Sequence, residues 1–114
     1  MNNAYEIPNL RFSGVAAAAV RRHRFVGVDA NGFTQEALVG DRAVGVSRNE
    51  AAAGEAVECA DGIVIVEAGA ALLPGMAIQA AAGGLAIPLA AGIELGICLT
   101  IVANAGELCC VKFK

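Results

Sequence analysis

The chain has 114 residues, of which 57% are hydrophobic but only 4% aromatic, and its formal net charge is −3. This length fits one compact domain, and the negative charge provides no general attraction to nucleic acid or to an anionic membrane surface. Small side chains each bury little area, so we expect the domain to gain stability by burying further surface in an oligomer or a larger assembly.

No group of residues has the spacing of a catalytic, metal or cofactor site. The sequence contains no CxxC pair, and His23 is its only histidine, so a zinc-ligand pattern is absent. GxSxG, Walker A, HExxH and dinucleotide-binding patterns are also missing. We therefore expect no enzyme activity, no metal and no cofactor. The four cysteines are expected to be free core residues in a chain without a secretion signal: Cys59, Cys98, Cys109 and Cys110.

The first 24 residues are expected to form an N-terminal arm. Residues 1–13 have mixed polarity and no period, which is typical of an extended segment that is ordered only when something holds it. Residues 15–20 are compatible with a helical turn or with a strand of small residues. The basic cluster Arg21-Arg22-His23-Arg24 is interpreted as a solvated turn or a protein contact, rather than a site for nucleic acid.

From residue 25 onward the pattern predicts short strands divided by glycine-rich turns. Asn31-Gly32 is a strong hairpin signal, and Pro88 fits only an edge strand or a strand end. Residues 62–67 contain a sustained run of β-branched side chains and predict a central buried strand, with breaks expected at 60–62 and after 67. The other expected strands are 25–28, 33–39, 43–46, 76–80, 85–89, 95–99 and 108–113. This pattern predicts an all-β fold, a compact sandwich or barrel.

An internal repeat divides residues 25–114 into two related β-meanders, at about 25–60 and 76–112. Three short motifs recur with offsets of 52, 51 and 52 residues: 31–33 with 83–85, 44–46 with 95–97, and 53–55 with 105–107. Glu55 and Glu107 follow Ala-Gly in both halves, and we expect each to stabilise a turn.

Residues 68–93 carry no charged side chain and are long enough to span a bilayer. They contain five glycines and two prolines, and a spanning helix with so many would leave backbone groups unpaired in lipid. We therefore expect strands and hairpins here, and no membrane partner.

The chain resembles the small capsid cement, or head decoration, proteins of tailed bacteriophages and prophages. The resemblance covers about residues 25–111. It rests on the order of several glycine-rich motifs: Ala52-Ala53-Gly54-Glu55, residues 62–72, Gly75, Gly83-Gly84-Leu85-Ala86, Leu95-Gly96-Ile97 and Ala105-Gly106-Glu107. The arm before Phe25 departs from the family pattern.

The resemblance implies a structural virion protein that binds the capsid exterior and bridges subunits of the major capsid protein, usually as a homotrimer. Such a protein would be made in the host cytoplasm. The expected contact residues lie in the arm: Tyr5, Ile7, Leu10, Phe12, Arg21, Arg22 and Arg24. The alternative is an oligomeric β domain that binds a ligand or a glycan without catalysis.

Overall fold

The structure, a computed structural model, describes residues 7–114, and nearly all the regular structure in that range is β-strand. The all-β class expected from the sequence is therefore confirmed. The strands are β1 (Ile7–Val15), β2 (Phe25–Val28), β3 (Thr34–Glu36), β4 (Gly45–Ser47), β5 (Ala56–Glu67), β6 (Ala77–Ala80), β7 (Ala86–Pro88), β8 (Gly96–Cys98) and β9 (Leu108–Phe113), with one 3₁₀ helix, η1 (Ala82–Gly84).

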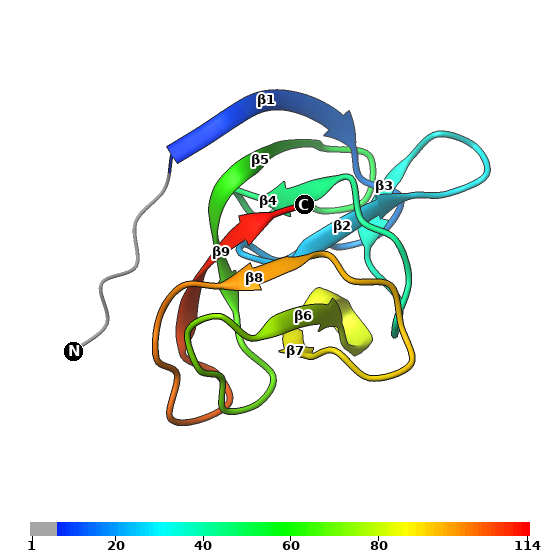
Figure 1. The fold of residues 1–114 in the computed structure, drawn as a ribbon. Coiled ribbons are helices and arrows are strands. Elements are labelled where there is room, and N and C mark those ends of the chain that lie inside the picture. The colour runs from blue at the N-terminus through cyan, green and yellow to red at the C-terminus, as the bar shows by residue number, and fades with distance from the viewer. Residues whose placement is uncertain (1–6) are drawn as a thin grey trace.

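The described strands form one antiparallel sheet with the order β3-β2-β4-β5-β9-β8-β6-β7, and β1 pairs with β5 outside this path. The sheet curls strongly, so that the ribbon resembles half of a barrel (Figure 1). The expected compact sandwich or barrel thus takes the form of a single curled sheet. Pro88 ends β7 at the edge of this sheet, where its missing N–H costs no ladder hydrogen bond.

The central strand is longer than the sequence pattern predicts. The break expected at residues 60–62 is wrong, because β5 continues through them from Ala56 to Glu67. Gly62 has a φ of 97°, a left-handed conformation that glycine adopts without steric cost. The strand therefore changes neighbours here without ending: β4 pairs with Cys59 and Ala60, and β9 pairs with residues 63–67.

Much of the expected arm belongs to the sheet. Residues 7–15 form β1, which runs antiparallel to β5, with Phe12 opposite Cys59. Residues 15–20 form neither a helical turn nor a continuous strand: β1 ends at Val15, residues 17 and 18 bend, and Ala16 and Val20 make isolated β-bridges. Val20 and Ala51 exchange backbone hydrogen bonds of 2.8 and 2.9 Å. Residues 1–6 lie outside the described part of the chain, and the division of the chain at residue 24 stays a prediction.

The backbone pairings of the first half recur 51 or 52 residues later. Ala16 N donates to Glu55 O at 2.9 Å, and Ala68 N donates to Glu107 O at 2.8 Å. Similarly, β2 pairs with β4 as β6 pairs with β8. Strand β5 takes part in both sets. Its pairing with β1 in the first half has the same register as its pairing with β9 in the second half.

Two apolar clusters fill the interior. The larger lies in the curl of the sheet and includes Phe25, Leu72, Ile78 and Val111. The smaller includes Val20, Val57 and Cys59, with Phe12 of β1 packed against it. All four cysteines are free and buried. Burial raises the pKa of the Cys109 thiol to about 12 and that of Cys59 to about 11, so both are protonated core side chains at neutral pH.

Candidate functional site

The basic cluster forms a tight turn between the Val20 bridge and β2, and Ser47 of β4 holds this turn in place. The Ser47 hydroxyl donates to Arg21 O and accepts from Arg24 N at 3.1 Å. His23 donates its backbone N–H to Ser47 O at 2.9 Å. Its φ of 62° is unusual for a residue with a side chain. This reversal sends neighbouring arginines in different directions.

Arg21 is paired with Glu36 of β3. The guanidinium donates from Nε and Nη2 to the two carboxylate oxygens, both at 2.9 Å, and Arg21 N donates to Glu36 Oε2 at 2.8 Å. Partial burial would raise the pKa of Glu36, but the hydrogen bonds and the positive charge of Arg21 outweigh it, so the net pKa is lowered. The bond from Arg21 to Glu36 likewise raises the pKa of the guanidinium. The turn is thereby tied to the β2–β3 hairpin.

Arg24 is buried and tied to the second half of the chain. Its side chain is 7% exposed and donates to Glu67 Oε1 at 3.2 Å and to Gly83 O at 3.1 Å. The η1 turn comes close to β2 here, since a Cβ on Gly84 would meet the backbone oxygen of Phe25. In this conformation Arg24 is a contact within the fold, and its guanidinium is not presented to a partner.

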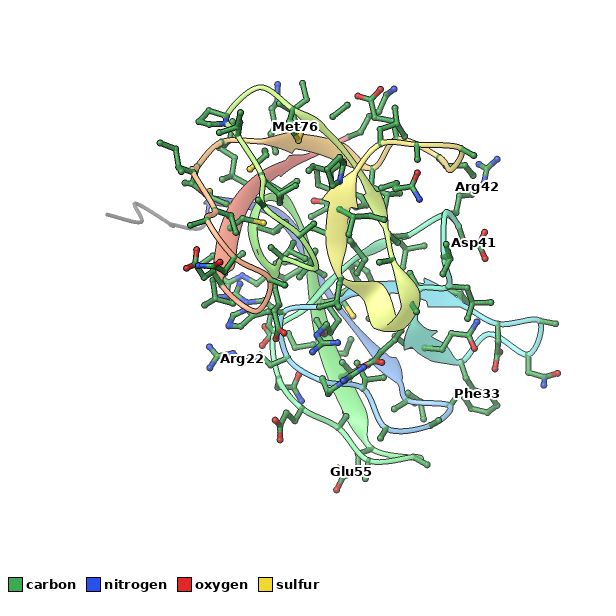
Figure 2. All side chains as sticks on the ribbon, turned by 90° about the horizontal axis from the view of Figure 1, so that it is seen from below. Arg22, Phe33, Asp41, Arg42, Glu55 and Met76 are labelled. Carbon is green, nitrogen blue, oxygen red and sulfur yellow. The ribbon has the colours of Figure 1, made fainter. Side chains whose placement is uncertain are left out.

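Arg22 is exposed like Arg21, but it projects away from the ribbon (Figure 2), whereas Arg21 is paired with Glu36. Of the residues in the basic cluster, it is therefore the best placed to meet an acidic group on another molecule.

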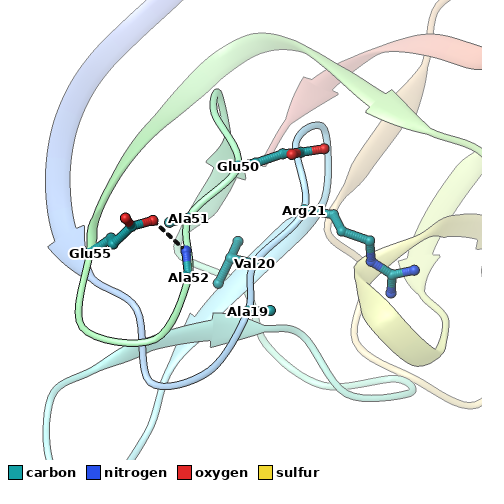
Figure 3. A pocket seen from close by; sticks show the side chains of 7 residues that line it. All are labelled: Ala19, Val20, Arg21, Glu50, Ala51, Ala52 and Glu55. Carbon is teal, nitrogen blue, oxygen red and sulfur yellow. Dashed lines mark hydrogen bonds between the residues drawn. The ribbon is translucent and has the colours of Figure 1, made fainter.

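A shallow pocket of about 460 Å³ lies beside this turn (Figure 3). Alanines form most of its floor, and Arg21, Glu50 and Glu55 stand around it. Glu55 accepts a hydrogen bond from Ala52 N at 2.7 Å, and Glu107 accepts one from Ala103 N at 3.0 Å in the matching turn. Both glutamates therefore stabilise turns, as expected. The pocket walls offer no aromatic platform on which a sugar ring could stack.

Of the expected contact residues that precede the basic turn, the structure describes the side chain of Phe12 alone. Tyr5 lies outside the described residues. Ile7 and Leu10 lie in β1, but their side chains fall outside the described part as well. Phe12 is half-buried and packs on the smaller apolar cluster, so its contacts are within the domain.

Exposed apolar side chains are a feature that the sequence analysis missed. Most occur singly or in pairs in the short connections, where sequence periodicity does not report burial, and Val15, Val28 and Ile97 lie in strands. Those of the described part are Val15, Val28, Phe33, Leu38, Val39, Val44, Leu73, Leu89, Ile93, Ile97 and Ile101. Contiguous groups of such side chains, rather than single ones, indicate a surface that binds another protein.

Over residues 7–114, no cluster of His, Cys, Asp and Glu has the geometry to hold a metal ion. No helix in this range has the length and apolar character needed to cross a bilayer.

Two comparisons with known proteins give a match. The model of a family described as phage cement protein matches residues 7–113. Among solved structures, the N base of the head fiber gp8.5 of bacteriophage phi29 has a TM-score of 0.76 and 16% sequence identity, covering 92% of this chain and 93% of the other. At this identity the similarity concerns the fold alone. None of the curated proteins gives a significant match.

Proposed function

Because the chain belongs to the phage cement protein family, whose members are structural phage proteins, we propose that it binds the outer surface of a phage capsid and bridges subunits of the major capsid protein. The observation that carries this proposal is the family match, which extends over residues 7–113 and so includes β1 as well as the rest of the sheet.

The physical support comes from the distribution of apolar surface. The core of the described chain consists mainly of valine, alanine and cysteine, and several leucines and isoleucines remain exposed. Burial of apolar area contributes about 25 cal/mol per Å². Docking on a capsid and on other copies would bury these side chains and add to the stability of both the protein and the shell.

In this proposal Tyr5, Ile7 and Leu10 contact the capsid from the N-terminal segment, and Arg22 contributes a charged contact. Arg21 takes part through its exposed face while it stays paired with Glu36. Phe12 and Arg24 support these contacts indirectly, since Phe12 fixes β1 and Arg24 fixes the basic turn. The protein is made in the host cytoplasm and joins the capsid exterior as a homotrimer.

Reconstitution on capsids that lack the protein would test this. Purified protein should bind at a saturating ratio to capsid subunits, and loaded capsids should resist higher temperatures before they release DNA. Arg22→Glu should lower the occupancy at a given concentration, because it reverses an exposed charge at the proposed contact.

Lys112→Glu is the matched control, since it makes the same charge change at an exposed position on β9. Failure of the wild-type protein to bind any capsid surface would contradict the proposal. Equal occupancy of the two variants would remove Arg22 from it.

A further inference from the structure

One apolar face of the first half is left open. We name it the β2–β4 face: Val28 at the end of β2, Leu38 and Val39 after β3, and Val44 just before β4. These side chains are 51%, 60%, 67% and 41% exposed, in that order. With Asp41 and Arg42, which lie at one edge of the molecule (Figure 2), Val28, Leu38 and Val44 line a hollow of about 290 Å³.

Two of the four corresponding positions in the second half, those of Val28 and Val44, are covered. Ala80 follows Val28 by 52 residues and is fully buried, and Leu95 follows Val44 by 51 residues and is 4% exposed. The cover is the segment 37–41 of the first half. Gly40 N donates to Ala80 O at 2.9 Å, and Gly40 O accepts from Ile93 N at 2.9 Å. Ala37 is buried in the same cluster as Ala80 and Leu95.

The second half has its own counterpart of the covering segment. Residues 89–93 follow residues 37–41 by 52 positions and read Leu-Ala-Ala-Gly-Ile. Leu89 and Ile93 are 39% and 42% exposed, and Ala90 and Ala91 are exposed as well. The chain therefore presents both an open face and an exposed segment of the kind that covers the matching face.

A basic residue, Arg42, stands next to Asp41 at one of these surfaces, and an acidic residue, Glu94, stands beside the other. Arg42 is exposed at the hollow of the β2–β4 face, and the residue 52 positions later is Glu94, next to the 89–93 segment. Glu94 is partly exposed and lies 3.8 Å from Lys114, a pair loose enough to exchange partners at a surface. Segment 89–94 of another copy would thus bring a carboxylate to Arg42.

We propose that residues 89–94 of one copy pack on the β2–β4 face of a second copy, so that the protein associates head to tail. This inference rests on the self-association in the proposed function and adds the surfaces that carry it. A heterologous contact of this type forms a ring when its rotation closes, and a trimer is one such ring. Because the N–H groups of Ala90 and Gly92 are bonded to Gln79 in their own chain, the exposed side chains of Leu89 and Ile93 would make this contact.

Sedimentation of the purified full-length protein at concentrations up to about 100 μM tests the proposal, without any capsid present. Wild type should sediment as an oligomer. Leu38→Asp should shift it to monomer, because it places a charge on a side chain that lines the hollow of the face. Ile101→Asp is the control: this side chain is equally exposed, at 63%, but belongs to another loop. It should leave the oligomer intact.

A charge exchange tests the pairing itself. Arg42→Glu and Glu94→Arg should each weaken association at least tenfold, and the double variant should recover most of it. Circular dichroism melts would show that each variant is folded. A wild-type protein that is monomeric at every concentration overturns the inference, as does a double variant no better than the singles. Capsid binding by a monomeric wild type would leave the proposed function standing.

Discussion

Gly40 and Gly92 are separated by 52 residues in the sequence and lie against each other in the fold: a Cβ built on Gly40 would come within 3.0 Å of the Gly92 Cα. The two halves of the chain therefore meet here through bare backbone. Gln79, which is buried, completes the contact by accepting hydrogen bonds from Ala90 N at 2.7 Å and Gly92 N at 2.9 Å.

Gly92→Ala should destabilise the protein, because the added methyl group would overlap Gly40 and the Gln79 side chain. Overpacking of this kind costs about 1–3 kcal/mol. Urea denaturation would measure the loss as a lower midpoint at an unchanged slope. Ala91→Ser, at the exposed neighbouring position, should stay within about 0.5 kcal/mol of wild type. Equal urea midpoints for Gly92→Ala and wild type would contradict this prediction, because they would mean that the two backbones can move apart here without loss of stability.

Arg24→Leu should lower stability by about 1–3 kcal/mol, because it removes the hydrogen bonds to Gly83 O and Glu67 and leaves the partly buried Gly83 carbonyl without this donor. Glu67 is partly exposed and can be solvated, which limits the loss. Arg22→Leu, two residues earlier, has no such role and should change the melting temperature little. If Arg24→Leu melted at a higher temperature than Arg22→Leu, a structural role for Arg24 would be contradicted.

The all-β class could be predicted from the sequence because runs of β-branched residues and glycine turns are local signals. The Asn31-Gly32 hairpin is confirmed: Gly32 has a φ of 84°, and Asp29 Oδ1 accepts from Asn31 N and Phe33 N. The prediction of a break at Gly62 was wrong because glycine occurs both in turns that end a strand and at bends within a strand. Only the neighbouring strands decide between them.

The partners of the basic turn could not be predicted from the sequence. Glu36, Glu67 and Gly83 lie 15, 43 and 59 residues from the arginines they bind, and no periodicity connects positions so far apart. For the same reason a four-residue basic cluster appeared as one surface feature. In the fold, Arg24 is buried while Arg22 is exposed.

The pairing of Arg21 with Glu36 predicts a dependence of stability on pH. The pKa of Glu36 is lowered from its ordinary value of 4.5 in the folded chain, so its contribution is present above pH 4.5 and disappears as the pH falls through the folded-state pKa. Wild type should therefore have a higher melting temperature than Glu36→Gln at pH 7. The difference in the free energy of unfolding should be no more than about 1 kcal/mol, because Arg21 is exposed. Melts between pH 7 and pH 3 should show the gap closing below pH 4.5. A gap that widens in acid would be inconsistent with this sign.

Two truncations separate the part of the N-terminal segment that stabilises the fold from the part proposed to bind the capsid. Removal of residues 1–13 takes away most of β1, including Phe12, and uncovers the edge of β5 at Cys59 and Ala60. The free energy of unfolding should fall by roughly 3 kcal/mol, as it does when a core aromatic residue is truncated. Cys59 should then react with a maleimide under native conditions, whereas the full chain, with all four thiols buried, should not.

Removal of residues 1–6 leaves β1 and its pairing with β5 in place, so this variant should melt at the same temperature as the full chain and keep its thiols protected. Its occupancy on capsids then isolates the contribution of the first six residues, Tyr5 among them. Reduced occupancy with an unchanged melt would support the proposed contact. Full occupancy would place capsid binding on the folded domain instead, with Arg22 and the exposed apolar side chains as the remaining candidates.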